Sequence, residues 1–192
     1  IVISYNDQNL LPYGFIGLIS IMKEMSNQTN FLSEIVPKYQ EQIGTSVAFC
    51  MDVLSKDAEE PKYIIELRLE AVKYLHNLIG VYPQIFNEGE NVGSKIPLLL
   101  DSLSNSFKVI DIDLYTALHN LLFTIVKKFY IFVPHFIQTI DLYVRNGFGL
   151  FETNPRCVNV SIYFWKEVAN YEYSLREKEE IRKKLGQHCF PD

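Results

Sequence analysis

The chain has 192 residues, of which 48% are hydrophobic and 14% aromatic, and its formal net charge is −5. This composition supplies enough apolar side chains for a sizeable core and excludes a disordered segment. A basic patch with interleaved aromatic residues is missing, so we expect no nucleic-acid partner. An uninterrupted run of about 18 apolar residues is also missing, so we expect no membrane-spanning segment.

Apolar residues recur at intervals of three and four along most of the chain, which is the spacing of one helix face. Proline, glycine and polar clusters divide these stretches. The predicted helices cover about residues 15–25, 37 or 45 to 54, 62–81, 92–103, 111–130, 134–145 and 155–171. A charged segment over residues 174–185 is expected to be a solvated helix or a connector. We therefore predict an all-α fold.

Local signals set several of these boundaries. Pro97 lies early in the fourth helix and fits its first turn if that helix begins near Lys95. Gly147 follows the sixth helix and is expected to be its left-handed cap. Asn154 and Pro155 have the residue types of an N-cap and a first helical position.

The four residues Leu-His-Asn-Leu occur twice, at Leu75–Leu78 and at Leu118–Leu121, which are 43 residues apart. A period of about 40–47 residues made of helix pairs is typical of HEAT and armadillo solenoids. We therefore predict a HEAT-repeat α-solenoid of about three and a half helix pairs. The first, third, fifth and seventh helices are expected to form one layer, and the second, fourth and sixth the other.

We expect residues 1–192 to be a single HEAT-repeat segment, cut at both ends from a longer array, because the chain opens on Ile1 rather than Met. A solenoid presents an extended binding surface, so a binding function is expected rather than catalysis. The mild acidity suits basic protein partners, although it is also common among proteins in general.

Cys50, Cys157 and Cys189 match no metal or redox spacing. Cys50 and Cys157 lie in helical apolar runs and are expected to be small core residues, which favours a reducing, intracellular compartment.

His76 and His119 occupy the same position of the two Leu-His-Asn-Leu copies, so they are expected within about 10 Å of each other. Metal sites normally need three or four ligands, so we expect no metal here. No Ser/His/Asp or Cys/His grouping has supporting local sequence, so we expect neither an enzyme nor a cofactor.

The stretch over residues 163–168, Tyr-Phe-Trp-Lys-Glu-Val, together with Glu172 resembles the Phe-Trp-containing B helix of the importin-β (karyopherin-β) family. Residues 114–122, with Ala-Leu-His-Asn-Leu, resemble the preceding B helix. Residues 133–136 fall where the next A helix begins, and 67–86 align with the B helix before that. The resemblance covers about residues 15–180. Asp111 departs from the family pattern, because it stands where Arg68 stands in the earlier helix.

This resemblance implies about the fourth to seventh HEAT repeats of a nuclear import receptor, wound as a right-handed superhelix. The implied partners are phenylalanine-glycine nucleoporins, with cargo or the importin-α adaptor and the GTPase Ran bound through the full-length protein. The implied location is the cytoplasm and the nucleus, including the nuclear envelope and pore. The family binds phenylalanine-glycine repeats in apolar grooves between neighbouring A helices.

We predict such a groove between the second and fourth helices, with exposed apolar residues that receive a phenylalanine ring. Its predicted members are Val47, Ala48 and Met51 on one side and Val92, Ile96 and Leu99 on the other. The alternative is that all six are core residues. The alternative function is that of another HEAT-repeat scaffold or assembly protein with an unknown partner. An enzyme would need a deep pocket with converging polar groups, for which the sequence offers no candidate.

Overall fold

The computed structural model of the chain describes residues 11–56, 62–87, 93–150 and 152–189. Within these ranges all regular secondary structure is helical. The α-helices are α1 (Leu11–Ser26), α2 (Val36–Ser55), α3 (Lys62–Val81), α4 (Ile96–Leu103), α5 (Ile112–Lys128), α6 (Ile137–Gly149) and α7 (Pro155–Cys189). Short π- or 3-10-helical segments join them, namely η2 (Phe31–Ile35), η3 (Pro83–Phe86), η4 (Ser106–Lys108) and η5 (Tyr130–His135). The predicted all-α class is therefore confirmed for the described residues.

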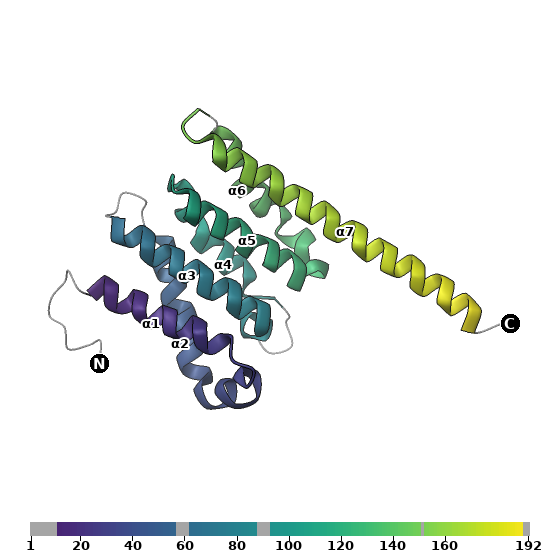
Figure 1. Ribbon diagram of the computed structural model, residues 1–192, viewed down its shortest axis with the longest axis horizontal. Helices are drawn as coiled ribbons and strands as arrows, with labels where there is room; N and C mark the ends of the chain where they lie inside the picture. Colours follow the sequence, from purple (N-terminus) through teal and green to yellow (C-terminus); the bar gives the residue numbers. More distant parts are fainter. Residues whose placement is uncertain (1–10, 57–61, 88–92, 151, 190–192) are drawn as a thin grey trace.

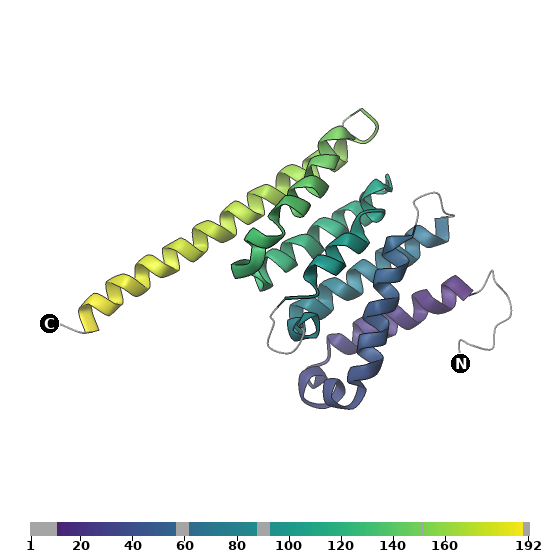
Figure 2. The same ribbon diagram turned by 180° about the vertical axis from the view of Figure 1, so that it is seen from behind.

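The α-helices form two layers. In the first, which we call the front row, α1, α3, α5 and α7 lie side by side and each packs against the next (Figure 1). The second layer, which we call the back row, consists of α2, α4 and α6. It lies against one face of the front row (Figure 2). There α2 packs on both α3 and α4, and α6 packs on α7. These are the two sets of helices that the sequence pattern assigned to two layers.

The front row buries the same positions in successive helices. Residues 43 apart on α3, α5 and α7 are buried in three sets, namely Ala71, Leu114 and Cys157, then Leu75, Leu118 and Ser161, then Leu78, Leu121 and Phe164. The back row has a similar register with spacings of 46 and then 44 residues. Its sets are Cys50, Ile96 and Ile140, then Val53, Leu99 and Tyr143, then Leu54, Leu100 and Val144. Three successive helix pairs thus contribute equivalent positions to one core.

Hydrogen bonds between pairs fall at equivalent places as well. The Ser106 hydroxyl donates to the carbonyl oxygen of Leu54 at 3.0 Å. The Tyr143 hydroxyl donates to the carbonyl oxygen of Leu100 at 2.7 Å. Leu54 and Leu100 occupy the same register position, near the ends of α2 and α4. Helices α2 and α4 are therefore each tied through a carbonyl of their last turn to a residue further along the chain, where the carbonyl has no partner within its own helix.

Several helix starts follow from local chemistry. Pro97 is in the first turn of α4 and Lys95 is its N-cap residue, so the predicted accommodation of this proline is confirmed. Before it, Gly93 has φ of 69° and donates its backbone N–H to the side chain of Asn87 at 2.8 Å. A left-handed backbone suits glycine, which has no Cβ. At α5, the Asp111 carboxylate caps the helix by accepting from the backbone N–H groups of residues 113 and 114.

The second helix begins at the earlier of its two predicted starts. It runs from Val36, with Pro37 in its first turn, and is kinked at Tyr39, where φ is −127° and ψ is 25°. The seventh helix begins at Pro155, as predicted. The prediction that Cys50 and Cys157 are core residues is also confirmed, since both thiols are free and buried.

Other boundary predictions were wrong. Gly147 is no left-handed cap, because α6 continues to Gly149 and Gly93 is the one described residue with positive φ. Instead, Gly147 is buried, and a Cβ there would overlap the Tyr115 hydroxyl and the Ser161 Oγ. The sixth helix begins at Ile137, because the residues before it form η5.

The seventh helix does not end near residue 171. It continues without a break to Cys189 and projects past the packed helices (Figure 1). The charged segment is therefore the second half of α7.

Candidate functional site

The predicted groove between α2 and α4 does not have the expected exposed lining. Val47 is 9% exposed, and Ile96 and Leu99 are fully buried, so the prediction that these three residues are exposed was wrong. Met51 is half-buried and Ala48 is exposed. Val92 lies outside the described residues. For Val47, Ile96 and Leu99, the alternative interpretation as core residues is the correct one.

The direct packing of α2 on α4 explains this difference. Helix α4 has only eight residues, and its buried apolar positions are Ile96, Leu99, Leu100 and Leu103, a spacing of three and four that forms one face. The sequence from Ile96 to Leu100 is almost entirely apolar, so periodicity alone does not show which side meets α2. The exposed leucine of α4 is Leu98, which was not among the predicted groove residues.

Leu98 has a counterpart on the next back-row helix. Leu98 on α4 is 62% exposed and Leu142 on α6 is 58% exposed, and the two are 44 residues apart. This is the spacing of the buried sets of α4 and α6, so both leucines occupy one register position. On α2 the corresponding residue is the exposed Asp52. The back row thus presents an exposed leucine at the same register position on two neighbouring helices.

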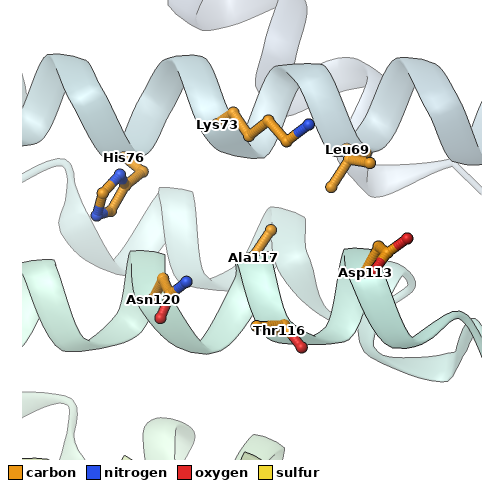
Figure 3. Close-up of a pocket in the computed structure, with 7 residues that line it drawn as sticks. All are labelled: Leu69, Lys73, His76, Asp113, Thr116, Ala117 and Asn120. Atoms are coloured by element: carbon orange, nitrogen blue, oxygen red, sulfur yellow. The ribbon is translucent and has the colours of Figure 1, made fainter.

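A groove of about 350 Å³ lies on the front row between α3 and α5. In Figure 3, His76 and Leu69 project from α3 toward α5, and Ala117 lies on the opposite wall. The complete lining is Leu69, Lys73 and His76 from α3 with Asp113, Thr116, Ala117 and Asn120 from α5. Two apolar residues thus lie among hydrogen-bonding side chains, one of which is positively charged and one negatively charged. Such a surface suits an extended polypeptide, which offers both apolar side chains and backbone amides.

Charges from α1 and α3 meet beside this groove. The Glu70 carboxylate accepts from Lys73 Nζ at 2.8 Å, from Lys23 Nζ at 3.0 Å and from the Ser20 hydroxyl at 3.2 Å. Burial by itself would raise the pKa of Glu70, but hydrogen bonds and charges from Lys73 and Lys23 outweigh it and lower that pKa. Lys73 is thus held by Glu70 at the edge of the groove.

A second groove, of about 540 Å³, lies between α5 and α7. It shares Thr116 and Asn120 with the first groove, so these two residues form a polar ridge along α5 between the two grooves. The remaining lining is His119, Phe123, Asn159, Val160, Tyr163, Phe164 and Glu167.

His119 in this second groove is 3% exposed. Its Nδ1 lies 2.9 Å from the carbonyl oxygen of Tyr115, and its Nε2 has no hydrogen-bond partner. Burial lowers the pKa of His119 to about 4, against a smaller raising effect from the Tyr115 carbonyl. The ring is therefore neutral at pH 7, with Nδ1–H donating to Tyr115.

The two histidines do not share a site. His76 lines the α3/α5 groove and His119 lines the α5/α7 groove. Across the described ranges, no three side chains of His, Cys, Asp or Glu gather as metal ligands would. Among the helices that the structure describes, none has the length and apolar character needed to cross a membrane.

Comparison of the chain with protein-family models, with curated proteins and with solved structures finds no match in any of the three. The resemblance to the importin-β family therefore stays a prediction from the residues that carry it.

Proposed function

We propose that this chain is a segment of a HEAT-repeat α-solenoid from an importin-β-like nuclear transport receptor, and that it binds proteins rather than catalysing a reaction. The observation that carries the proposal is the recurrence of buried positions every 43 residues in α3, α5 and α7. A HEAT repeat has about this period. Sequential packing of α1 on α3, α3 on α5 and α5 on α7 also supports it, because each repeat of a solenoid contacts mainly its neighbours.

In this proposal, phenylalanine-glycine nucleoporin repeats bind the back row. The proposed contacts are Leu98 and Leu142, with Met51 and Ala48 on the neighbouring helix, in place of the buried members of the predicted groove. Each exposed leucine offers one small apolar contact. Several such contacts bind weakly one at a time and exchange quickly, and together they hold a multivalent partner.

The front-row grooves are the proposed surface for cargo or for the importin-α adaptor, and Ran is engaged through the full-length protein. Their mixed lining, with Lys73, Asp113 and Glu167 among amides and aromatic rings, supports binding of a polypeptide. The proposed location is the cytoplasm and nucleus, including the nuclear pore.

The test is an NMR titration of the chain with a peptide of four Phe-Gly repeats, alongside a Ser-Gly peptide of equal length. We expect weak, saturable shifts from the Phe-Gly peptide alone, in resonances of the back row. Leu98→Asp and Leu142→Asp each reduce this binding, since each removes an apolar contact and adds a charge. Ile162→Asp is the matched control, because Ile162 is similarly exposed on the front-row helix α7.

Shifts that are equal for both peptides, or that Ile162→Asp reduces as much as Leu98→Asp, would argue against the proposed contacts. A folded wild-type chain that binds neither peptide would favour another HEAT-repeat scaffold with a different partner.

A further inference from the structure

An apolar pocket of about 540 Å³ lies where α5, η5, α6 and α7 meet; it shares Phe164 with the α5/α7 groove and includes neither Leu98 nor Leu142. Its lining includes Val126, Val133, Ile137, Trp165 and Val168, together with Glu172. Trp165 is half-buried, and its ring packs edge-on against Phe164, with ring centres 5.2 Å apart. The pocket thus offers a flat aromatic wall and aliphatic sides.

The rim of this pocket is also apolar. It is formed by η5, none of whose residues is buried. Ile131 in this segment is 82% exposed, the largest fraction among the large apolar side chains whose exposure the structure describes. Apolar surface in water costs about 25 cal/mol per Å² relative to burial, and an exposed apolar patch around a pocket marks a contact site.

Glu172 is the one charged residue of the lining. Its Oε1 accepts from the Tyr130 hydroxyl at 2.9 Å. None of the ion pairs among the described residues includes Glu172. A carboxylate has two oxygens and room for several donors, so one hydrogen bond from Tyr130 leaves capacity for a cation. The lining of this apolar pocket thus carries one negative group, and outside the lining the charge of Arg176 also acts on Tyr130.

We propose that this pocket binds an extended protein segment in which a phenylalanine is directly followed by lysine or arginine. The phenylalanine ring enters the pocket against Trp165 and Val168, and the cation of the next residue pairs with Glu172. The inference does not rest on the proposed transport function, because it concerns other residues and a partner of different charge.

Trp165 provides a direct reporter, because it is the single tryptophan of the chain. We would titrate the chain with the capped peptide Gly-Ser-Phe-Lys-Ser-Gly and follow tryptophan emission. The peptides Gly-Ser-Ala-Lys-Ser-Gly and Gly-Ser-Phe-Glu-Ser-Gly are the controls. We expect a saturable emission shift from the Phe-Lys peptide and much weaker responses from both controls. No saturable shift, or equal responses to the Phe-Lys and Ala-Lys peptides, overturns the proposal.

Two variants test the charge. Glu172→Gln keeps the size of the side chain and removes its charge, so we expect about fivefold weaker binding of the Phe-Lys peptide, typical of one exposed ion pair. Glu177→Gln is the matched control on the exposed part of α7 and leaves binding unchanged. Equal affinities for the two variants overturn the assignment of Glu172.

Val168→Asp places a charge in the pocket and abolishes the response, with circular dichroism to confirm that the helices remain. If peptide binding survives in folded Val168→Asp, the pocket is not the site. An emission shift that grows with protein concentration alone would show that a second copy covers the pocket, which also overturns the proposal.

Discussion

The two copies of Leu-His-Asn-Leu are identical in sequence but not in environment. Their leucines behave alike, since Leu75, Leu78, Leu118 and Leu121 are all fully buried. Their histidines both line grooves but differ in exposure, because His76 on α3 is half-buried, whereas His119 on α5 is buried among rings. The position in the repeat therefore determines that the leucines are buried. The burial of the histidine depends on the residues around it.

The neighbours on the same helix account for this difference. Around His119, the residues four before and four after are Tyr115 and Phe123, and around His76 they are Val72 and Gly80. The ring of His119 also meets Phe107 at 5.6 Å and Phe164 at 5.7 Å, measured between ring centres. Aromatic rings therefore cover the His119 side chain, while the smaller residues beside His76 leave its side chain partly exposed.

The largest effect is expected where the two copies are alike. Leu75→Ala and Leu118→Ala each remove a fully buried side chain, and each should lower the free energy of unfolding by about 3 kcal/mol. Urea unfolding followed by circular dichroism measures both. Ser161→Ala occupies the same register on α7 but loses only the contact with the Tyr115 hydroxyl, so it should cost about 1 kcal/mol. If Ser161→Ala costs as much stability as Leu118→Ala, the Ser161 side chain contributes more than its contact with the Tyr115 hydroxyl, which contradicts this prediction.

The two histidines should contribute differently to the loss of stability in acid. Because the folded-state pKa of His119 is about 4 and its ordinary value is 6.5, the unfolded chain takes up a proton first as pH falls. Stability is therefore unaffected above about pH 6.5 and decreases as pH falls toward 4, by about 3 kcal/mol in total. Urea unfolding at pH 7 and pH 4 measures this loss.

His119→Gln removes the titrating group and should flatten this acid dependence, even though it lowers stability at every pH. His76→Gln should keep most of the dependence, because His76 is less buried. If wild type and His119→Gln lose equal stability between pH 7 and pH 4, the acid sensitivity lies elsewhere, for example at Glu70.

Glycine substitutions test how tightly the helices are packed near each Leu-His-Asn-Leu copy. Gly147→Ala places a methyl group against the Tyr115 hydroxyl and Ser161 Oγ beside the α5 copy, and should destabilise the fold by about 2 kcal/mol. Gly80→Ala on α3 meets nothing within 4 Å and should stabilise its helix by about 0.5 kcal/mol. Thermal unfolding of both variants compares them. Tyr115→Phe should recover part of the loss in Gly147→Ala, and the absence of any coupling would show that the crowding is elsewhere.

A smaller loss of stability is expected at the start of α5. Asp111→Ala removes the N-cap of the helix that carries the second copy, and should cost about 1 kcal/mol. Chemical unfolding measures this. Asp113→Ala, in the first turn of the same helix, is the control with a smaller expected loss, because only the helix dipole is affected. Equal losses in the two variants would argue against a specific capping role for Asp111.

Much of the fold could be predicted from the sequence, because helix periodicity and local breakers are short-range signals. The predicted bounds of α3, residues 62–81, coincide with the structure, and the start of α7 at Pro155 was also predicted. The length of α7 was not predicted, because its second half is charged on all sides and carries no apolar stripe. Gly147 was misassigned because glycine suits both a left-handed cap and a close helix contact.

The candidate site was harder to predict than the fold. The sequence alone determined that the chain is helical, that its helices alternate between two layers, and that positions about 43 residues apart are equivalent. These follow from spacing along the chain. The tertiary structure decided that Val47, Ile96 and Leu99 are buried while Leu98 and Leu142 are exposed, and that Trp165 and Glu172 share one pocket with η5. These features depend on how neighbouring helices cross, and a crossing angle is set by side chains that are far apart in sequence.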